Sequence, residues 1–165
     1  KDGLMKLYKI KKSNIDKRGL YAANNIKNGT KIIEYIGKII SKKMSEQSRK
    51  FDNKKDIYLF NLNNKYDLDG DFKFNTARLI NHSCEPNCEV TGKGLKLWIS
   101  AIRDIRKGEE LSYDYGFSYD RDYKQFPCKC GEKNCVGYIV RFGSRWRINK
   151  KFKKQKTSIS NFFQK

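Results

Sequence analysis

Long hydrophobic runs are missing from this chain of 165 residues. Its apolar stretches span only a few residues each, far short of the ~20 that a transmembrane helix needs. Nothing near its start is typical of a signal peptide, and because it begins at Lys1 we expect a fragment or a processed chain. Apolar residues make up 38%, or about 39% with Gly counted in place of Tyr, below the usual ~45–50%. Aromatic residues reach 13%, however, and each buries a large area, so one packed domain is expected.

Acidic residues are scarce as well. The chain has 18 Asp and Glu against 37 Lys and Arg, a net charge of +19, and residues 141–165 hold nine basic side chains and no acid. A field of this sign attracts polyanions, nucleic acid above all. The alternative is compositional bias, because the sequence is rich in Lys, Asn and Ile, as AT-rich genomes tend to encode.

A complete disulfide framework is not expected, because the number of cysteines, five, is odd. Cys128, Cys130 and Cys135 form a C-x-C-x4-C string with Gly131 in its turn, which resembles the spacing of metal ligands. Cysteines so close together do not easily pair with one another. Thiolate ligands would place the chain in a reducing compartment.

Short β-rich segments separated by turns are predicted along most of the chain. We expect strands over residues 4–10, 20–23, 31–40 with a break at Gly37, 57–61, 65–68, 89–91, 95–101 and 111–115. Turns are expected at Asn28-Gly29, at Gly92-Lys93-Gly94 and at Lys107-Gly108. A short helix is predicted from the N-cap Ser41 to about Lys50, and one helical turn within residues 74–82. The pattern indicates a β-rich α+β domain.

Three segments carry the most specific signal in the sequence. They are Arg18-Gly19-Leu20-Tyr21, Asn81-His82-Ser83-Cys84-Glu85-Pro86-Asn87-Cys88 and Gly108-Glu109-Glu110-Leu111-Ser112-Tyr113-Asp114-Tyr115-Gly116. Together they resemble the SET domain, the fold of most protein-lysine methyltransferases, and the cysteine string that follows resembles its post-SET segment. The resemblance covers roughly residues 5–140.

The resemblance implies a fold and a division of the chain. The expected fold is a set of small curved sheets with a C-terminal pseudoknot, which brings residues 81–84 beside 113–116, followed by a post-SET zinc loop. Residues 1–117 would form the SET domain with a short insert at about 41–68. Residues 118–140 would form the post-SET zinc segment, and residues 141–165 a basic C-terminal tail.

The resemblance also implies S-adenosylmethionine as the cofactor. Matching positions place Arg18, Gly19 and Leu20 against its methionine and adenine parts, with Gly19 allowing a close backbone approach. Asn81 is expected to bind the methionine end, and His82 to contact adenine through its backbone. The side chain of His82, the single histidine, is expected to be structural and not a general base.

Tyr35 and Tyr115 match the tyrosines that line the lysine channel of this family. A narrow apolar channel and a nearby sulfonium both disfavour a charged lysine, so no dedicated base is required. Tyr115 would position the methyl group and stabilise the cationic transition state through its oxygen. Tyr113 occupies the position where Tyr or Phe is found in the family, and its hydroxyl is expected to limit the product mainly to monomethyl-lysine. For most of the ten tyrosines the alternative is simply a good strand residue.

Four of the cysteines match the family's zinc ligands: Cys84, Cys128, Cys130 and Cys135. Four thiolates close a tetrahedral structural site with no open position, which would clamp the C-terminal loop and do no chemistry. Cys88 is left over, and we interpret it as a small buried hydrophobic residue, with a reactive thiol as the alternative.

Two features depart from the family pattern. Phe74 replaces a common Gly. The insert carries Lys42, Lys43, Lys50, Lys54 and Lys55, which fits poorly with a basic substrate. Opposing charge could come from five aspartates, Asp67, Asp69, Asp71, Asp120 and Asp122, or these could be solvated turn residues.

The sequence therefore predicts a protein-lysine methyltransferase, a monomer without membrane contacts, acting on histones or another basic chromatin protein. It would lie in the nucleus or on chromatin in a eukaryote, and at the nucleoid otherwise. The alternatives are a non-catalytic SET module that binds peptide or DNA, and an enzyme for a non-histone substrate such as a ribosomal protein.

The end of the chain suggests a further partner. Ile159, Phe162 and Phe163 are spaced as in the motif that docks replication proteins on the sliding clamp. The usual first Gln is replaced by Lys156, while Gln155 lies one position early. The alternatives are a tail that folds back on the domain and a chance match.

Overall fold

The computed structural model describes residues 6–52 and 58–152. The β-rich α+β architecture is confirmed over this range. The strands are β1 (Tyr8–Lys12), β2 (Arg18–Ala22), β3 (Lys31–Tyr35), β4 (Lys38–Ser41), β5 (Leu59–Asn61), β6 (Tyr66–Asp69), β7 (Asn81–His82), β8 (Cys88–Lys93), β9 (Lys96–Ala101) and β10 (Ser112–Tyr113). The helices are α1 (Lys42–Gln47) and four 3-10 segments, Arg49–Asp52, Thr76–Leu79, Tyr123–Gln125 and Phe142–Arg147. The sequence motif at Ile159, Phe162 and Phe163 lies outside the described residues, as do Lys54 and Lys55.

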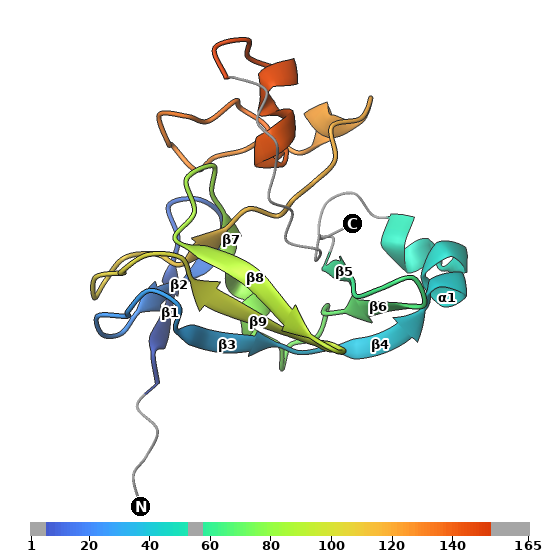
Figure 1. Ribbon diagram of the computed structural model, residues 1–165, viewed down its shortest axis with the longest axis horizontal. Helices are drawn as coiled ribbons and strands as arrows, with labels where there is room; N and C mark the ends of the chain where they lie inside the picture. The colour runs from blue at the N-terminus through green and yellow to red at the C-terminus, as the bar shows by residue number, and fades with distance from the viewer. Residues whose placement is uncertain (1–5, 53–57, 153–165) are drawn as a thin grey trace, which may run out of the picture.

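The strands form small sheets that wrap around one core (Figure 1). β1 pairs with β2, and β9 lies between β3 and β8, all antiparallel. β6 lies between β4 and β5, also antiparallel. β7 and β10 form a parallel pair of two residues each, although they are 30 residues apart in sequence. This last pair is the contact that a SET pseudoknot would produce.

Gly37 divides one apolar run between two sheets. β3 pairs with β9 and β4 pairs with β6, with only Ile36 and Gly37 between the two strands. A Cβ atom at Gly37 would lie 2.1 Å from the Asp69 carbonyl oxygen, so only glycine allows the backbones to approach this closely. The predicted break at Gly37 is confirmed.

Several predicted boundaries are wrong. β1 begins at Tyr8 and continues to Lys12, later than predicted. The β8–β9 hairpin forms, but Gly92 pairs with Leu97 inside the ladder, so the turn lies two residues later, where Gly94 has φ +64°. β10 covers two residues only, where five were expected.

The helix after Ser41 is confirmed at its start and shorter at its end. The Ser41 hydroxyl accepts the Met44 amide hydrogen at 3.2 Å, as an N-cap does. The helix ends at Gln47 because Ser48 has an extended backbone, and a separate 3-10 turn follows.

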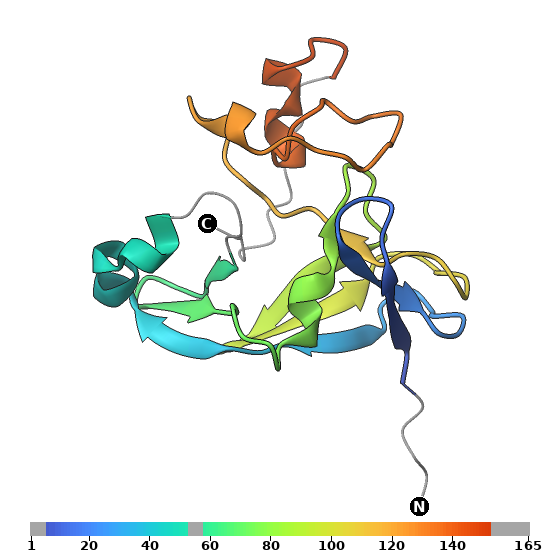
Figure 2. The same cartoon turned by 180° about the vertical axis from the view of Figure 1, so that it is seen from behind.

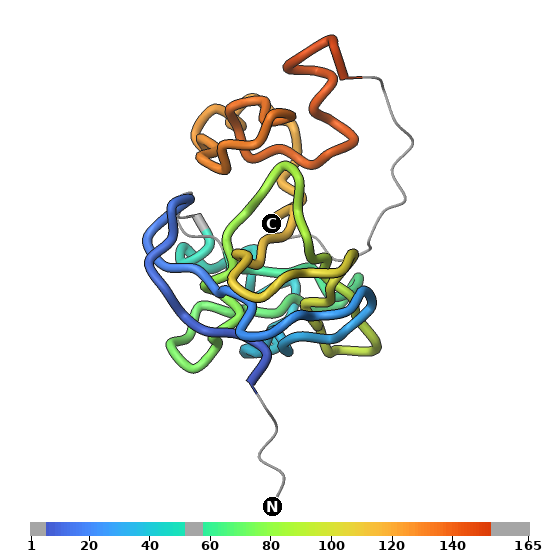
Figure 3. Tube along the Cα trace, turned by 90° about the vertical axis from the view of Figure 1, so that its left-hand side faces the viewer, coloured from blue at the N-terminus to red at the C-terminus, as the bar shows by residue number. Residues whose placement is uncertain are grey.

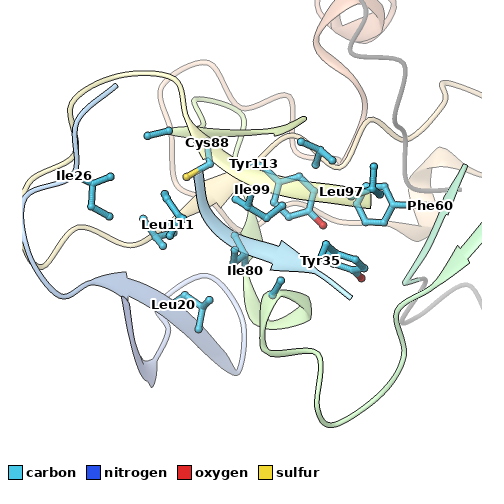
Figure 4. Packing of buried hydrophobic residues seen from close by; sticks show 14 of the residues in the cluster. Leu20, Ile26, Tyr35, Phe60, Ile80, Cys88, Leu97, Ile99, Leu111 and Tyr113 are labelled. Atoms are coloured by element: carbon cyan, nitrogen blue, oxygen red, sulfur yellow. The ribbon is translucent and has the colours of Figure 1, made fainter. Parts of the chain in front are cut away.

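The core lies between the sheets and is lined by buried residues of the strands. On β9, Leu97 and Ile99 are fully buried, and Leu20, Leu111 and Ile105 pack into the same cluster (Figure 4). The 3-10 turn Thr76–Leu79 leads into β7 and lies on the side of the molecule that faces the viewer in Figure 2. Figure 4 shows Tyr35, Tyr113 and Phe60 together at one end of this cluster.

The C-terminal part of the described chain forms its own layer at one end of the strands (Figure 3). The sequence predicted that a basic tail begins at residue 141, but residues 141–147 pack on the domain. Val140 is fully buried, and Phe142–Arg147 form a 3-10 segment in which Arg145 is only 1% exposed. Hydrogen bonds from Arg145 to the carbonyls of Val140 and Cys84 hold this segment on the domain.

Candidate active site and cysteine cluster

The parallel pair β7–β10 joins the two most specific motifs. Asn81 lies opposite Ser112, and His82 lies opposite Tyr113. The Ser83 amide donates to the Tyr113 carbonyl at 3.3 Å, which extends the contact past the strands. The Asn-His-Ser-Cys motif and the Tyr-Asp-Tyr motif are therefore neighbours in space.

His82 is 3% exposed and both of its ring nitrogens have partners. Nδ1 accepts the Tyr115 amide hydrogen at 3.2 Å, so the proton of a neutral ring belongs on Nε2, which lies 3.6 Å from the Cys84 sulfur. A histidine held in this way has no nitrogen left for a substrate. The expectation that its side chain is structural agrees with this geometry.

The three tyrosines singled out in the sequence lie in one aromatic row. The ring centroids of Tyr113 and Tyr115 are 4.9 Å apart, and Phe60 lies 4.7 Å from Tyr35 and 6.3 Å from Tyr113. Tyr35 and Tyr113 are 1% and 2% exposed, while Tyr115 is half-buried. Phe60 was not identified from the sequence, since nothing in a short strand distinguishes it from any other core residue.

The hydroxyl groups of this row differ in their surroundings. Tyr115 donates its hydroxyl hydrogen to the Ile80 carbonyl at 2.9 Å. The Tyr35 hydroxyl is buried without a hydrogen-bond partner among the described residues, and the Asn75 amide donates to the Gly70 carbonyl. Burial raises the pKa of both Tyr35 and Tyr113 well above the ordinary value, so both hydroxyls stay protonated. An orphaned buried hydroxyl is expensive, and it indicates a place where a ligand atom completes the site.

The cofactor-binding residues expected from the resemblance are only partly brought together. Gly19 is buried beside the Asn81 side chain. Leu20 points into the core and is fully buried, and its carbonyl accepts the Leu111 amide hydrogen at 2.7 Å. The Arg18 side chain is exposed. Gly19 and the backbone carbonyl of Arg18 therefore lie next to the Asn81 side chain, whereas the side chains of Arg18 and Leu20 point elsewhere.

The four cysteines proposed as zinc ligands converge. The sulfur atoms of Cys84, Cys128, Cys130 and Cys135 all lie within 4.8 Å of one another, and none is in a disulfide. Four thiolates at ~2.3 Å from one ion stand ~3.8 Å apart, and the Cys84 and Cys128 sulfurs are 3.9 Å apart. Donor type, number and convergence therefore fit a structural zinc ion.

Electrostatics within the cluster favour a thiolate at Cys84, whereas burial raises the pKa of the Cys135 thiol to about 11. A hydrogen bond from Cys128 lowers the pKa of the Cys84 thiol to about 3, with help from His82 and Arg145, although burial opposes the shift. The same bond raises the pKa of the Cys128 thiol, as expected when two sulfurs share one proton. A divalent cation in the cluster would displace that proton.

Cys88 stands apart from the cluster. It is 1% exposed, and burial raises the pKa of its thiol to about 12. Its sulfur donates to the Asn87 side-chain oxygen at 3.4 Å, and the residue packs in the hydrophobic core. The interpretation as a small buried hydrophobic residue is confirmed, and a reactive thiol is not supported.

Two insert lysines neutralise buried aspartates. Lys42 Nζ lies 2.5 Å from the Asp67 carboxylate, which is fully buried and also accepts the Ser45 hydroxyl at 2.6 Å. Lys50 Nζ lies 2.5 Å from Asp69, whose side chain is 7% exposed. The proposed roles of Asp67 and Asp69, as counter-charges for a substrate or as solvated turn residues, are both wrong. Two of the five insert lysines, Lys42 and Lys50, are therefore internal counter-ions, and their charge does not oppose a basic substrate.

Phe74, the departure from the family pattern, points outward. It is 62% exposed and stacks on Phe72 at 5.0 Å. The next residue, Asn75, is fully buried, accepts the Ile36 amide hydrogen and donates to the Gly70 carbonyl. The loop therefore keeps Asn75 inside while a large side chain replaces the usual glycine.

Among the described residues, no helix is long and apolar enough to cross a membrane. This agrees with the short apolar runs of the sequence.

Comparisons with known proteins identify the family. A model of the SET domain matches residues 17–116, more than half of the chain, so the chain belongs to the SET-domain family. Histone-lysine N-methyltransferase 2D of Homo sapiens is 42% identical in an alignment of 132 positions, which covers 76% of this chain and 2% of that protein. The H3 lysine-4 specific histone-lysine N-methyltransferase of Schizosaccharomyces pombe is 42% identical over 135 residues, 77% of this chain and 14% of that protein. Putative histone-lysine N-methyltransferase 1 of Plasmodium falciparum is 39% identical over 140 residues, 81% of this chain and 2% of that protein. The chain thus spans only a small part of the length of the curated relatives it matches.

Proposed function

We propose that this chain is an S-adenosylmethionine-dependent protein-lysine N-methyltransferase. Its support is the parallel pair β7–β10, because one short contact unites the aromatic row with Asn81 and Gly19. SET-domain membership and relatives named as histone-lysine methyltransferases agree with it.

The aromatic row is the proposed channel for the substrate lysine. Buried rings exclude water and raise the free energy of an ammonium, so the lysine enters the reaction as a neutral amine. The buried hydroxyl of Tyr35 is positioned to hydrogen-bond that amine, and no ionised base is available in the row, because both buried tyrosines stay protonated. The bound cofactor supplies an electrophilic methyl group.

Tyr115 is the proposed catalytic residue. Its hydroxyl hydrogen is committed to the Ile80 carbonyl, so the lone pairs of its oxygen face away from that bond. A fixed oxygen of this kind orients a methyl group and stabilises developing positive charge. Gly19, Arg18, Leu20, His82 and Asn81 are proposed to bind the cofactor through backbone or side-chain contacts.

The zinc site is proposed to be structural. One ion held by Cys84 of the central motif and three cysteines of residues 118–140 would clamp this segment over the channel end. Since all four positions of the tetrahedron are filled by sulfur, no open position remains for substrate or water.

The proposed substrate is a histone or another basic chromatin protein, and the proposed location is the nucleus or chromatin. The relatives' names support this choice, and so does the net charge of +19, which suits substrates presented on nucleic acid. Four exposed basic residues of the described C-terminal segment would contact phosphates: Arg141, Arg147, Lys150 and Lys151. Arg145 is excluded from this role because it is buried.

The test is methyl transfer from labelled S-adenosylmethionine to free histones, nucleosomes and ribosomal proteins. Labelled lysine in a histone supports the full proposal, and labelled ribosomal protein alone moves the substrate to the non-histone alternative. Cofactor binding without transfer to any of the three would support a non-catalytic module.

A further inference from the structure

One carboxylate accepts hydrogen bonds from three side chains, two in the β1–β2 hairpin and one in β7. Glu110 Oε1 accepts the Ser13 hydroxyl at 2.7 Å and the Asn81 amide Nδ2 at 2.9 Å. Its Oε2 accepts the Tyr21 hydroxyl at 2.8 Å. Glu110 thus ties the β1–β2 hairpin to β7, although it belongs to neither.

The position of this carboxylate explains the glycine beside it. A Cβ atom at Gly19 would lie 2.3 Å from Glu110 Oε1 and 3.3 Å from Asn81 Nδ2. The space that Gly19 leaves open is therefore filled by a side chain of the protein itself. The expected close approach of the Gly19 backbone to the cofactor stays a prediction.

The surroundings of Asn81 decide which way its amide points. Nδ2 lies 2.9–3.3 Å from four oxygens: those of the Glu110 carboxylate, the Asp16 and Arg18 carbonyls and the Ser13 hydroxyl. The first three are pure acceptors, so a rotated amide would place oxygen against oxygen at each of them. Oδ1 must point the other way, where it contacts no donor among the described residues.

We infer that Glu110 is a positioning residue that fixes the polarity of Asn81, so that Asn81 Oδ1 is presented as an acceptor for a cationic ligand group. This inference rests on the proposed function, since the group it fits is the ammonium of the amino-acid part of S-adenosylmethionine. An amide nitrogen presented in its place would instead favour the carboxylate of that same part. Glu110 makes the shortest of the contacts that decide between the two, and the Asp16 and Arg18 carbonyls add to it.

The experiment exchanges donor and acceptor between the two residues. Asn81→Asp places two carboxylates in contact, so the new one is repelled from its place. Asn81→Asp combined with Glu110→Gln restores one donor and one acceptor in the pair and leaves a free oxygen at residue 81, while the Asp16 and Arg18 carbonyls still face a carboxylate oxygen. The probe is S-adenosylhomocysteine, which keeps the ammonium and has no methyl to transfer, with affinity measured by calorimetry at pH 8.

We expect the single variant Asn81→Asp to weaken binding by about tenfold or more, the size of a lost hydrogen bond to a charged group. The double variant should bind at least about threefold more tightly than Asn81→Asp, because the amide introduced by Glu110→Gln donates to the new carboxylate, but it should not recover fully, because the Asp16 and Arg18 carbonyls still oppose an oxygen. A double variant that binds as weakly as Asn81→Asp, or more weakly, would overturn the inference. A ligand analogue that lacks the amino group should show little difference between the chains, whereas an equal difference with this analogue would contradict the role of the ammonium.

A second comparison covers the case in which Asn81→Asp fails to fold, judged by its thermal unfolding. Glu110→Ala should weaken binding in the unaltered chain and have no further effect when Asn81 is already Ala. Equal losses in both backgrounds would mean that Glu110 does not act through Asn81. If the unaltered chain does not bind S-adenosylhomocysteine at all, the proposed function itself fails, which separates the two outcomes.

Discussion

Arg145 donates from its guanidinium to the Asp114 carboxylate at 2.8 Å, and Asp114 lies between Tyr113 and Tyr115 in sequence. The same guanidinium donates to the Cys84 carbonyl at 2.7 Å. One buried side chain of the C-terminal segment therefore contacts both the tyrosine motif and the backbone of a proposed zinc ligand. The 3-10 segment Phe142–Arg147 therefore packs against the candidate active site.

Replacing this arginine should damage stability and activity together. Arg145→Met leaves the Asp114 carboxylate with backbone donors from Gly116 and Phe142 but without its cation, and breaking a buried pair costs about 3 kcal/mol or more. We expect a lower unfolding temperature and a large loss of methyl transfer, measured by calorimetry and by the labelled-cofactor assay. Lys124→Met, a change at an exposed residue to which no role is assigned, is the control and should leave both unchanged.

Zinc should copurify at about one ion per chain, because four thiolates close a single tetrahedral site. Cys130→Ser should lose the metal and the activity while most β-structure remains, as seen by elemental analysis and circular dichroism. Cys88→Ala is the matched control and should keep the metal, since Cys88 lies outside the cluster. Full activity after exhaustive chelation would contradict a clamping role.

Product number should depend on Tyr113. Its buried hydroxyl is expected to hold a water or the amine in the aromatic row and so to crowd out further methyl groups. The unaltered chain should yield mainly monomethyl-lysine, and Tyr113→Phe should raise the share of di- and trimethyl-lysine. Mass spectrometry of the products decides the matter, and trimethyl-lysine as the main product of the unaltered chain would be incompatible with this role.

Nucleosomes should be better substrates than free histones if the basic C-terminal residues contact phosphates. Activity on nucleosomes should then fall steeply with salt. The informative variant replaces Arg141, Arg147, Lys150 and Lys151 with Gln, because a truncation at residue 140 would also delete Arg145. Loss of the nucleosome preference in that variant would support the proposal, and equal rates on both substrates at low salt in the unaltered chain would favour compositional bias.

Docking on a sliding clamp remains a prediction from sequence. A peptide of residues 150–165 should bind the clamp of the same organism, and Phe162→Ala with Phe163→Ala should abolish binding. Lys156→Gln, which restores the usual first residue of the motif, should tighten it. No binding of the unaltered peptide at ~100 μM, equivalent to ~5.5 kcal/mol, would rule the idea out.

The motifs could be predicted from the sequence because their chemistry is local. The Ser41 cap, the break at Gly37 and the spacing of the cysteines each depend on a few neighbouring residues, and all three appear in the structure. The contact between Asn81 and Ser112 is different. It joins distant segments by a two-residue parallel pair, which no periodicity reveals, and only resemblance to a family predicted it.

The sequence could not predict which charged residues are buried and paired with one another. Asp67 and Arg145 look like surface residues in a basic sequence, yet both are buried because a distant partner neutralises each of them. Glu110 stands in a recognisable motif, but its three donors come from segments up to 97 residues away. Burial of a charge depends on the whole fold, which is why these assignments failed while the hydrophobic pattern succeeded.

The most direct test of the account compares the unaltered chain with Tyr115→Phe in single-turnover methyl transfer to nucleosomes, with S-adenosylhomocysteine binding measured in both. The account predicts equal binding and transfer slower by about a hundredfold in the variant, the range seen when one transition-state contact is removed. Unchanged transfer by Tyr115→Phe, or binding without any transfer by the unaltered chain, would contradict it.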